Sequence, residues 1–516
     1  MTEVLDVAIA GYGPVGQTLA ALLGREGLNV GVFERHATPY GLPRAIRFDH
    51  EAMRVWQRLG IVAALEDDIL AVDRYVWLGA DGEPILTLPS PPAPSGWAYS
   101  YVFFQPLLEA ALDAAVAAEA PVQVRRGVTV VRIEERDDLV ELGLQDTDRP
   151  AAGLRTVRAR YAVGADGGGS LVREALGIAL EDLGFRERWV VIDVLPRDAD
   201  ALAPLDGPVQ HCDPARPHVV VPCGRRHRRF EFMLLPGERV EDFAGVERAW
   251  ALLAPYADPS RATIVRHAVY EFRSAVATSM QRGRCFLAGD AAHLMPPHMG
   301  EGMCSGVRDA NGLAWKLALV VRGLAHPRVL ESHTAERLPH NTAIVELSQA
   351  MGRISCELDP AAAAERDATL RAGGVAPPPF PTLHEGVTAD CALAGTLAVQ
   401  GVVEVDGRSG RLGEVAGEGF VLVSAQPEPW SALGDEARAF LDGLGTNLVA
   451  LGDAPGAVRD VDGALTSWLE RSEAAAVLIR PDSYVFGAAR TNAELPALVD
   501  DLRRRLGPEH SDGGGT

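Results

Sequence analysis

The feature that most constrains this chain is the run Gly11 to Gly16 (GYGPVG), a GxGxxG pattern between a strand-like stretch, Asp6 to Ala10, and a helix-like stretch, Gln17 to Arg25. In such a turn Gly11 permits the tight bend, Gly13 lets a pyrophosphate approach the backbone, and Gly16 packs helix against strand. Pro14 and Val15 stand at the start of the helix, where free N–H groups and the helix dipole favour a phosphate. The pattern predicts a βαβ unit that opens a parallel sheet and binds a dinucleotide.

An acidic residue ends the second strand, which is where a dinucleotide-binding unit carries the carboxylate that binds the ribose. Glu34 ends the next strand-like stretch, Asn29 to Glu34, and its carboxylate can accept both hydroxyls of a ribose. Arg35 follows it and is predicted to contact the same cofactor. The alternative is a glycine-rich turn without a ligand. This motif does not distinguish FAD from NAD.

Composition excludes several classes of partner. The net charge is −21, whereas nucleic acid and anionic membranes require a positive surface. No apolar run is long enough to span a bilayer, and the acidic start is not a secretory signal. The six cysteines are scattered without a CxxC pair, which is typical of free thiols in a reducing compartment. We expect a soluble cytoplasmic protein with no metal site, no nucleic-acid partner and no membrane contact.

Two further motifs follow. Gly289 to His293 (GDAAH) precedes Pro296-Pro297 and Gly300-Glu301-Gly302. Asp290 comes after a buried strand, where its carboxylate can bond a cofactor hydroxyl; the alternative is a helix-capping aspartate. Earlier in the chain, Ala165-Asp166-Gly167 is followed by Ser170 and Arg173.

In this order the three motifs resemble those of the class A FAD-dependent aromatic hydroxylases, a family of flavoprotein monooxygenases. Arg44 and Gln105 match family positions near the flavin. The stretches GYGPVGQ, LPRAIRFDHE, HCDPARPH, RRFEFML and MCSGVRDANGLAWKLALVVRG are similar to the 3-(3-hydroxyphenyl)propionate hydroxylase-like branch. The likeness covers most of the first 340 residues and is weaker towards the C-terminus.

The resemblance implies a reaction. NAD(P)H would reduce FAD, which would react with O2 to give a flavin C4a-hydroperoxide, and the distal oxygen would pass to a phenolic or polycyclic aromatic substrate. Three other hypotheses stay open: Baeyer–Villiger or ring-opening oxidation, a non-catalytic flavin-binding protein, and an NAD-linked dehydrogenase. The protein is expected to be a monomer or a homodimer.

The resemblance also implies an α/β fold. We expect a Rossmann-like FAD-binding domain from residues 1–184 and 276–370, with an antiparallel-sheet substrate domain at 185–275. A linker at 371–384 would lead to a thioredoxin-like C-terminal domain at 385–508 and a disordered tail at 509–516. Since Cys391 has no CxxC partner, packing or dimer contact is the expected role of the C-terminal domain.

The family motif places a loop beside the flavin. Gly300 belongs to it, and Gly302, Met303 and Cys304 begin a helix whose N–H groups can point at the flavin pyrimidine edge. Pro297 would stiffen this loop against the flavin; the alternative is a simple turn proline.

His298 and Glu301 flank the same loop, where related sequences often carry Phe and Gln. His298 is therefore the candidate that could bond a substrate hydroxyl, and a packed or solvent-facing histidine is the alternative. The basic run Arg225 to Arg229 lies between two strand-like stretches, and we expect it to be a solvated hairpin tip.

Overall fold

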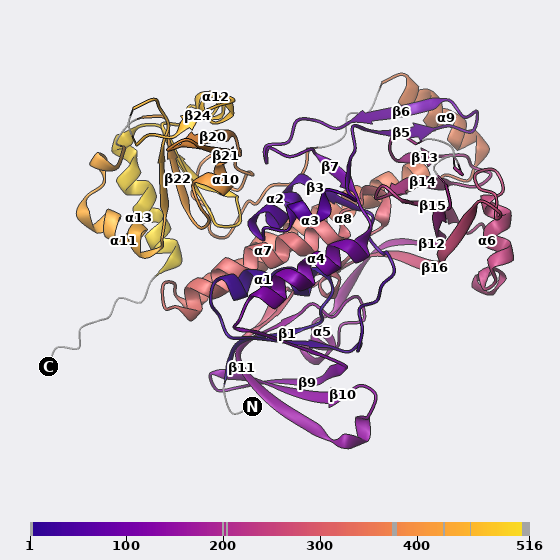
Figure 1. Cartoon of the computed structure of the whole chain (residues 1–516), viewed down its shortest axis with the longest axis horizontal. Helices are drawn as coiled ribbons and strands as arrows, with labels where there is room; N and C mark the ends of the chain where they lie inside the picture. Colours follow the sequence, from indigo (N-terminus) through magenta and orange to yellow (C-terminus); the bar gives the residue numbers. More distant parts are fainter. Residues whose placement is uncertain are drawn as a thin grey trace.

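The computed structural model describes residues 4–198, 201–202, 205–373, 379–426, 429–454 and 456–507. Figure 1 shows a central body of helices over a sheet, a second sheet on one side of it, and a separate C-terminal unit on the other. Residues 374–378 of the expected linker and the expected tail at 509–516 lie outside the described residues. In the part of the chain described, no helix is long and apolar enough to cross a membrane.

The predicted βαβ unit forms the centre of the first sheet. Strand β1 (Leu5–Ala10) leads through α1 (Pro14–Arg25) to β2 (Val30–Glu34), and β2 pairs with β1 in parallel. On its other side β1 pairs in parallel with β11 (Leu154–Gly164). The sheet order is β17-β18-β11-β1-β2-β8, so the carboxyl ends of β1, β2 and β11 meet at one edge.

This sheet is the middle of three layers (Figure 1). Helices α1, α4 (Gln105–Ala118) and α7 (Gly302–Val321) cover one face, where Val7 and Ile9 of β1 are buried. Strands β9 (Val128–Arg136) and β10 (Leu139–Asp146) extend the sheet from β11 and pack on the other face with Ala8 and Ala10. Alternate residues of one short strand therefore fill two cores.

The second sheet is mainly antiparallel, with the order β19-β16-β12-β15-β14-β13-β5-β6. Its strands are β5 (Arg74–Leu78), β6 (Pro84–Pro89), β12 (Leu180–Pro196), β13 (Val209–His211), β14 (His218–Cys223), β15 (His227–Met233), β16 (Ala262–Ala277) and β19 (His293–Leu294). Strand β5 pairs in parallel with β13, so the sheet takes strands from outside residues 185–275. The β5–β6 hairpin falls in a stretch where the sequence shows no clear period.

The basic run between β14 and β15 corrects one expectation. Arg225 and Arg226 are exposed at the hairpin tip, as predicted. Arg229 is not solvated: it lies inside β15, is 3% exposed, and pairs with the buried Asp193 at 2.7 Å. The strand begins at His227, so every second residue after it can turn inward.

The described residues of the C-terminal unit form two sheets. Strands β22 (Val421–Ser424), β23 (Asn447–Ala450) and β25 (Ala476–Ile479) form a sheet with β26 (Val485–Ala489) in the order β23-β22-β25-β26. A smaller sheet joins β20 (Val402–Val405), β21 (Arg408–Arg411) and β24 (Arg459–Asp460). Helices α10 (Leu412–Val415), α11 (Asp435–Gly443), α12 (Ala464–Arg471) and α13 (Leu495–Leu506) complete the unit.

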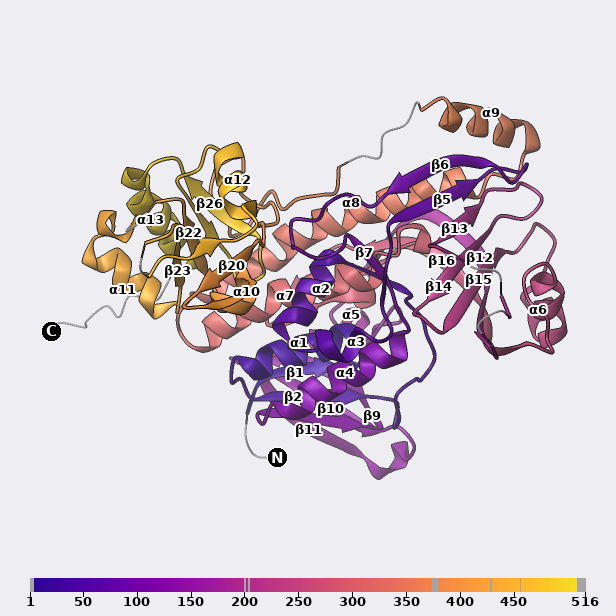
Figure 2. The same ribbon diagram turned by 45° about the horizontal axis from the view of Figure 1, so that its top comes forward.

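The long helix α8 (Ser332–Ser355) runs from the C-terminal unit towards the second sheet (Figure 2). At its C-terminal-unit end, Glu336 accepts hydrogen bonds from Arg480 and from Lys316 of α7. All three side chains are fully buried. A buried and paired charge cluster therefore joins the unit to the helices over the first sheet.

The remaining elements connect these parts. They are β3 (Arg47–Asp49), α2 (His50–Arg58), α3 (Val62–Leu65), β4 (Leu70–Ala71), β7 (Ser100–Val102), β8 (Val122–Arg126), α5 (Leu171–Ala175), α6 (Val246–Leu253), β17 (Gln281–Arg282), β18 (Cys285–Leu287) and α9 (Pro360–Arg371).

Candidate active site

A cavity of about 1130 Å³ lies between the two sheets. Ligand sites in proteins span roughly 300–1,000 Å³, so this cavity has room for a large ligand. Most of the predicted site residues line it: Gly13, Pro14, Val15, Arg44, Gln105, Asp290, Pro297, His298, Gly300, Gly302 and Met303. Six others are outside the lining: Gly11, Gly16, Glu34, Arg35, Asp166 and Cys304.

The three motif glycines have different surroundings. Gly11 has a φ of +100°, and a Cβ there would lie 2.2 Å from the carbonyl oxygen of Ala165. A Cβ at Gly16 would lie 2.2 Å from the carbonyl oxygen of Gly11. A Cβ at Gly13 would meet nothing within 4 Å. Gly11 and Gly16 are thus required by the fold, whereas Gly13 leaves open space at the cavity wall.

The carboxylate of Glu34 fixes the turn that holds these glycines. It accepts hydrogen bonds from the backbone N–H of Tyr12 and of His36, both at 2.8 Å. Arg35 is exposed, and its Nε donates to the ring of His36 at 3.3 Å. These two residues lie at the carboxyl end of β2, beside the cavity but not in its wall.

Asp166 caps a helix. Its carboxylate accepts hydrogen bonds from the hydroxyl of Ser170 and from the N–H of Val172 (3.2 Å), at the start of α5. Arg173 donates to the carbonyls of Gly168 (3.1 Å) and Ala291 (3.0 Å), which ties this loop to the GDAAH loop. The neighbours of Asp166, Ala165 and Gly167, are the residues that reach the cavity.

Asp290 lies at the cavity wall with its carboxylate unpaired. It begins the turn after β18, and no described residue hydrogen-bonds to its side chain. Burial raises the pKa of Asp290, although its side chain still has a surface open to the cavity. His293 of the same motif is instead bound to Asp309 at 2.7 Å. The Asp290 carboxylate therefore offers the cavity a free hydrogen-bond acceptor.

Gln105 and Arg229 hold the loop that carries Arg44. The side-chain oxygen of Gln105 accepts the backbone N–H groups of Arg44 (2.9 Å) and Ala45 (2.6 Å). Arg229 donates to the carbonyls of Arg44 and of Pro43 (2.9 Å). The guanidinium of Arg44 lies over the ring of Tyr40 at 4.3 Å. The second sheet and α4 therefore fix this loop from two sides.

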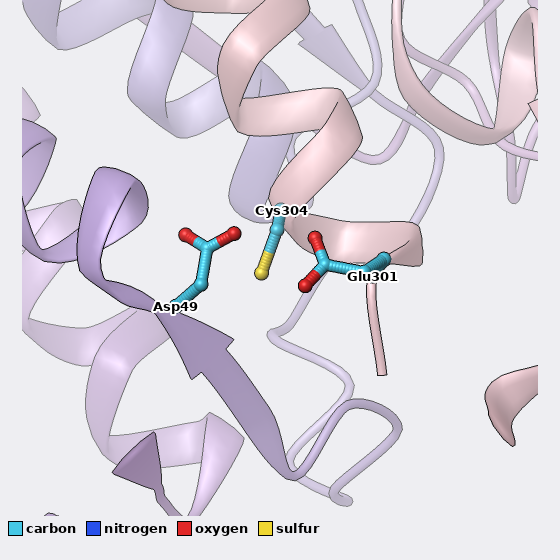
Figure 3. A group of neighbouring side chains, drawn as sticks. All are labelled: Asp49, Glu301 and Cys304. Carbon is cyan, nitrogen blue, oxygen red and sulfur yellow. The ribbon is translucent and has the colours of Figure 1, made fainter. Parts of the chain in front are cut away.

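The loop before α7 is held by arginines. Pro297 to Met299 form one 3-10 turn, Gly300 has a φ of +65°, and α7 begins at Gly302 as predicted. Glu301 pairs with Arg308 at 3.0 Å and also with Arg47. Figure 3 shows Glu301, Asp49 and Cys304 pointing towards one another.

That group has the residue types of a metal site, with ligand atoms within 4.8 Å of one another. Arg308 pairs with both carboxylates, so an arginine supplies the balancing charge. Burial raises the pKa of the Cys304 thiol well above its usual value, which keeps the thiol protonated. The cluster anchors the start of α7.

His298 faces both the cavity and α8. Its ring makes edge contacts with Phe185 and Trp189, whose centroids are 5.8 and 5.9 Å away. Its Nδ1 lies 3.4 Å from the hydroxyl of Ser355, and its Nε2 lies 4.0 Å from the Cys356 sulfur. Burial lowers the pKa of His298 to about 4, so the imidazole is neutral at physiological pH. Both ring nitrogens are directed at α8, which is the geometry of a packed histidine.

Two family models and several known proteins match this chain. Residues 4–348 match the family model of an FAD binding domain, and residues 395–505 match that of the HcaD C-terminal domain. A probable NADH-specific resorcinol 4-hydroxylase of Rhodococcus jostii (strain RHA1) is 38% identical over 98% of this chain and 96% of its own length. This chain belongs to the FAD-dependent aromatic hydroxylases.

Other members of the hydroxylase family support the placement. A 3-(3-hydroxy-phenyl)propionate/3-hydroxycinnamic acid hydroxylase of Burkholderia cenocepacia (strain HI2424) is 36% identical over 95% of this chain and 94% of its own. The structure of aklavinone-11 hydroxylase with FAD and aklavinone superimposes with a TM-score of 0.79, at 25% identity over 98% of this chain and 100% of the other. The resemblance seen in the motifs is confirmed.

Sequence reasoning missed part of the cavity of this hydroxylase. Tyr75, Gln210 and Glu231 line it from three strands of the second sheet, and Arg47 lines it beside Glu301. Alternation along β15 could have indicated that Glu231 shares a face with Arg229. The position of Tyr75 could not be predicted, because the β5–β13 pairing joins distant parts of the chain.

Proposed function

We propose that this protein is a monooxygenase that hydroxylates a phenolic or polycyclic aromatic substrate with NAD(P)H and O2. In the balanced reaction one aromatic C–H becomes C–OH and NAD(P)H becomes NAD(P)⁺. The second oxygen atom leaves as water, and one proton is consumed. Bound FAD would supply the redox chemistry by accepting a hydride and activating O2.

The observation that carries the proposal is that a single cavity has one wall suited to a cofactor and another wall suited to an aromatic ring. Gly13, Asp290 and Gly302 lie on it, and they offer open backbone, a free carboxylate and a helix start. The rest is largely apolar and comes from the second sheet, including Leu86, Leu88, Val191, Val219 and Val221. A cofactor wall that faces an aromatic-sized apolar wall suits oxygen transfer to a ring.

The protein would bind and orient the cofactor and the substrate, and it would exclude water from them. Asp290 would hold a hydroxyl of the cofactor, and the start of α7 at Gly302 and Met303 would stabilise negative charge on the reduced cofactor. Pro297 would stiffen the loop, and neutral His298 would shape the adjoining wall. Burial in an apolar cavity limits the loss of the activated oxygen to water.

The finer architecture belongs to the same proposal. The first sheet supports a Rossmann-like FAD-binding domain, the second sheet supports a substrate domain, and the β23-β22-β25-β26 order supports a thioredoxin-like C-terminal domain. A cytoplasmic location, a monomeric or homodimeric state and the domain limits stay predictions.

Purified protein loaded with FAD tests the proposal. An aromatic substrate should accelerate NAD(P)H oxidation and yield a product heavier by one oxygen atom, with the ring intact. A ring-opened or lactone product would favour the Baeyer–Villiger or ring-opening alternative. FAD binding without NAD(P)H oxidation by any aromatic would favour a non-catalytic flavin-binding protein.

A further inference from the structure

A buried carboxylate on the floor of the second sheet has no assigned role. Glu231 of β15 lines the cavity and is 8% exposed. In the sheet it stands between Val191 of β12 and Val219 of β14, two apolar neighbours that also line the cavity. Burying a carboxylate among valines is costly unless a hydrogen-bond donor satisfies it.

The neighbouring cations satisfy Glu231 only in part. Arg229 forms a long ion pair with it at 3.6 Å. Arg266 of β16 also favours its charge, Asp193 opposes it, and the guanidinium of Arg266 donates to the carbonyl of Pro43. The guanidinium of Arg229 is already bound by both oxygens of Asp193, at 2.7 and 3.0 Å, and by two backbone carbonyls. Burial accordingly raises the pKa of Glu231 despite Arg229. Since Glu231 lines the cavity, a further hydrogen-bond donor can approach its carboxylate from there.

Two more polar groups line the same wall. Gln210 of β13, next to Val219 in the sheet register, is 1% exposed, and its amide donates to the His218 carbonyl at 3.1 Å. Its side-chain oxygen accepts a long hydrogen bond of 3.4 Å from the hydroxyl of Tyr75. Burial raises the pKa of Tyr75 and keeps its hydroxyl protonated. The wall thus offers two acceptors and one hydroxyl.

We propose that Glu231, Tyr75 and Gln210 form a hydroxyl-binding site that selects neutral aromatic rings with two or more hydroxyl groups over aromatic carboxylates. One ring hydroxyl donates to Glu231, and a second exchanges hydrogen bonds with Tyr75 and Gln210. A substrate carboxylate placed here would face another carboxylate. Arg229 is already neutralised by Asp193, and Arg266 is shared between the Pro43 carbonyl and Asp193. This inference rests on the proposed function.

The test uses FAD-loaded protein and two probes, resorcinol and 3-(3-hydroxyphenyl)propionate. Binding is followed through the visible spectrum of the flavin, and KM and kcat through aromatic-dependent NAD(P)H oxidation. The wild type should bind resorcinol at least about tenfold more tightly than the carboxylate. In Glu231→Gln the resorcinol Kd should rise about tenfold or more, since a hydrogen bond to a charged group is lost. In Glu231→Gln, 3-(3-hydroxyphenyl)propionate should bind no more weakly than it binds to the wild type.

Glu187→Gln is the matched control. Glu187 lies on β12 outside the cavity, and burial raises its pKa too. This variant should change neither Kd. Tyr75→Phe is the second variant: it should weaken resorcinol binding at unchanged FAD content, which keeps the proposal testable if Glu231→Gln misfolds.

A pH series separates a binding role from a structural one. Resorcinol binding by the wild type should tighten as pH rises through the pKa of Glu231 and stay flat in Glu231→Gln. Equal affinity of wild type and Glu231→Gln for both probes, or tighter binding of the carboxylate by the wild type, overturns the proposal. The proposed function survives either of these results if the protein still hydroxylates some aromatic compound. If no aromatic perturbs the flavin or drives NAD(P)H oxidation, both fail.

Discussion

The Tyr484 hydroxyl in the C-terminal unit donates a hydrogen bond of 2.9 Å to Glu51 of helix α2. Glu51 pairs with Arg308 at 3.1 Å, and Arg308 pairs with Glu301 at 3.0 Å. These contacts form a continuous path from the C-terminal unit to the loop before α7. The unit is therefore joined to the wall of the active-site cavity through buried charges.

Tyr484→Phe should destabilise the protein by about 1.5–3 kcal/mol, because it removes a hydrogen bond to a charged group. Burial disfavours the charged form of Glu51, but Arg308 holds the pKa of Glu51 below the usual value. The acceptor is therefore ionised at neutral pH. The midpoint of thermal unfolding measures the effect. Tyr40→Phe, at a side chain 43% exposed, should leave that midpoint unchanged. Equal midpoints for Tyr484→Phe and the wild type would remove this contact from the account.

Gly13→Ala and Gly16→Ala should fail in different ways. The methyl group at Gly16 would collide with the Gly11 carbonyl, so we expect little folded protein. The methyl group at Gly13 would meet no protein atom within 4 Å, so the fold should survive while FAD affinity falls. Circular dichroism and FAD titration distinguish the two defects. Wild-type FAD affinity in a folded Gly13→Ala protein would show that no phosphate approaches this residue.

Asp290→Ala should weaken FAD binding by roughly 1.5–3 kcal/mol, which is about a 10- to 150-fold rise in Kd. Burial raises the pKa of Asp290, so its charge opposes folding at neutral pH. The FAD-free variant should thus be no less stable than the FAD-free wild type. Isothermal titration gives the affinity and thermal unfolding gives the stability. Unchanged affinity would mean that Asp290 does not contact the cofactor.

His298 should influence the pH dependence of stability. Its folded pKa of about 4 lies below the unfolded value of about 6.5, so the unfolded state takes up its proton first as pH falls. This group adds to stability above pH 6.5, and that contribution declines between pH 6.5 and 4. His298→Phe should reduce the acid sensitivity in this window by up to about 1.4 kcal/mol per pH unit. Urea unfolding at several pH values tests it.

The same variant tests the substrate role of His298. If the imidazole holds a substrate hydroxyl, His298→Phe should keep its FAD, bind substrate more weakly and release more hydrogen peroxide per NAD(P)H. Since both ring nitrogens are directed at Ser355 and Cys356, we expect unchanged substrate affinity instead. A large loss of coupling at normal FAD content would contradict that expectation.

The first sheet could be predicted because its signals are local. Gly11, Gly16 and Glu34 lie within one βαβ unit, and Glu34 accepts a hydrogen bond from the backbone of the glycine turn. Gly11 and Gly16 each lie too close to a backbone carbonyl to carry a side chain. The start of α7 was predictable for the same reason, since glycines precede a long helical pattern.

The substrate side of the cavity depends on contacts between distant residues. Arg229 can be buried because Asp193 of the neighbouring strand pairs with it. The sequence of the run Arg225 to Arg229 does not indicate this partner. The orientation of His298 is decided by the end of α8, where Ser355 lies 57 residues later in the sequence. Glu301 likewise pairs with Arg47, 254 residues earlier. Such pairings follow from the fold and have no sequence period.

The central claim is best tested by turnover of the FAD-loaded protein with resorcinol and NADH under oxygen-18 gas. The account predicts aromatic-dependent NADH oxidation and a product that keeps its ring and carries one oxygen-18 atom as a new hydroxyl. Folded protein that cannot be loaded with FAD, or a hydroxylated product whose new oxygen comes from water, would contradict it.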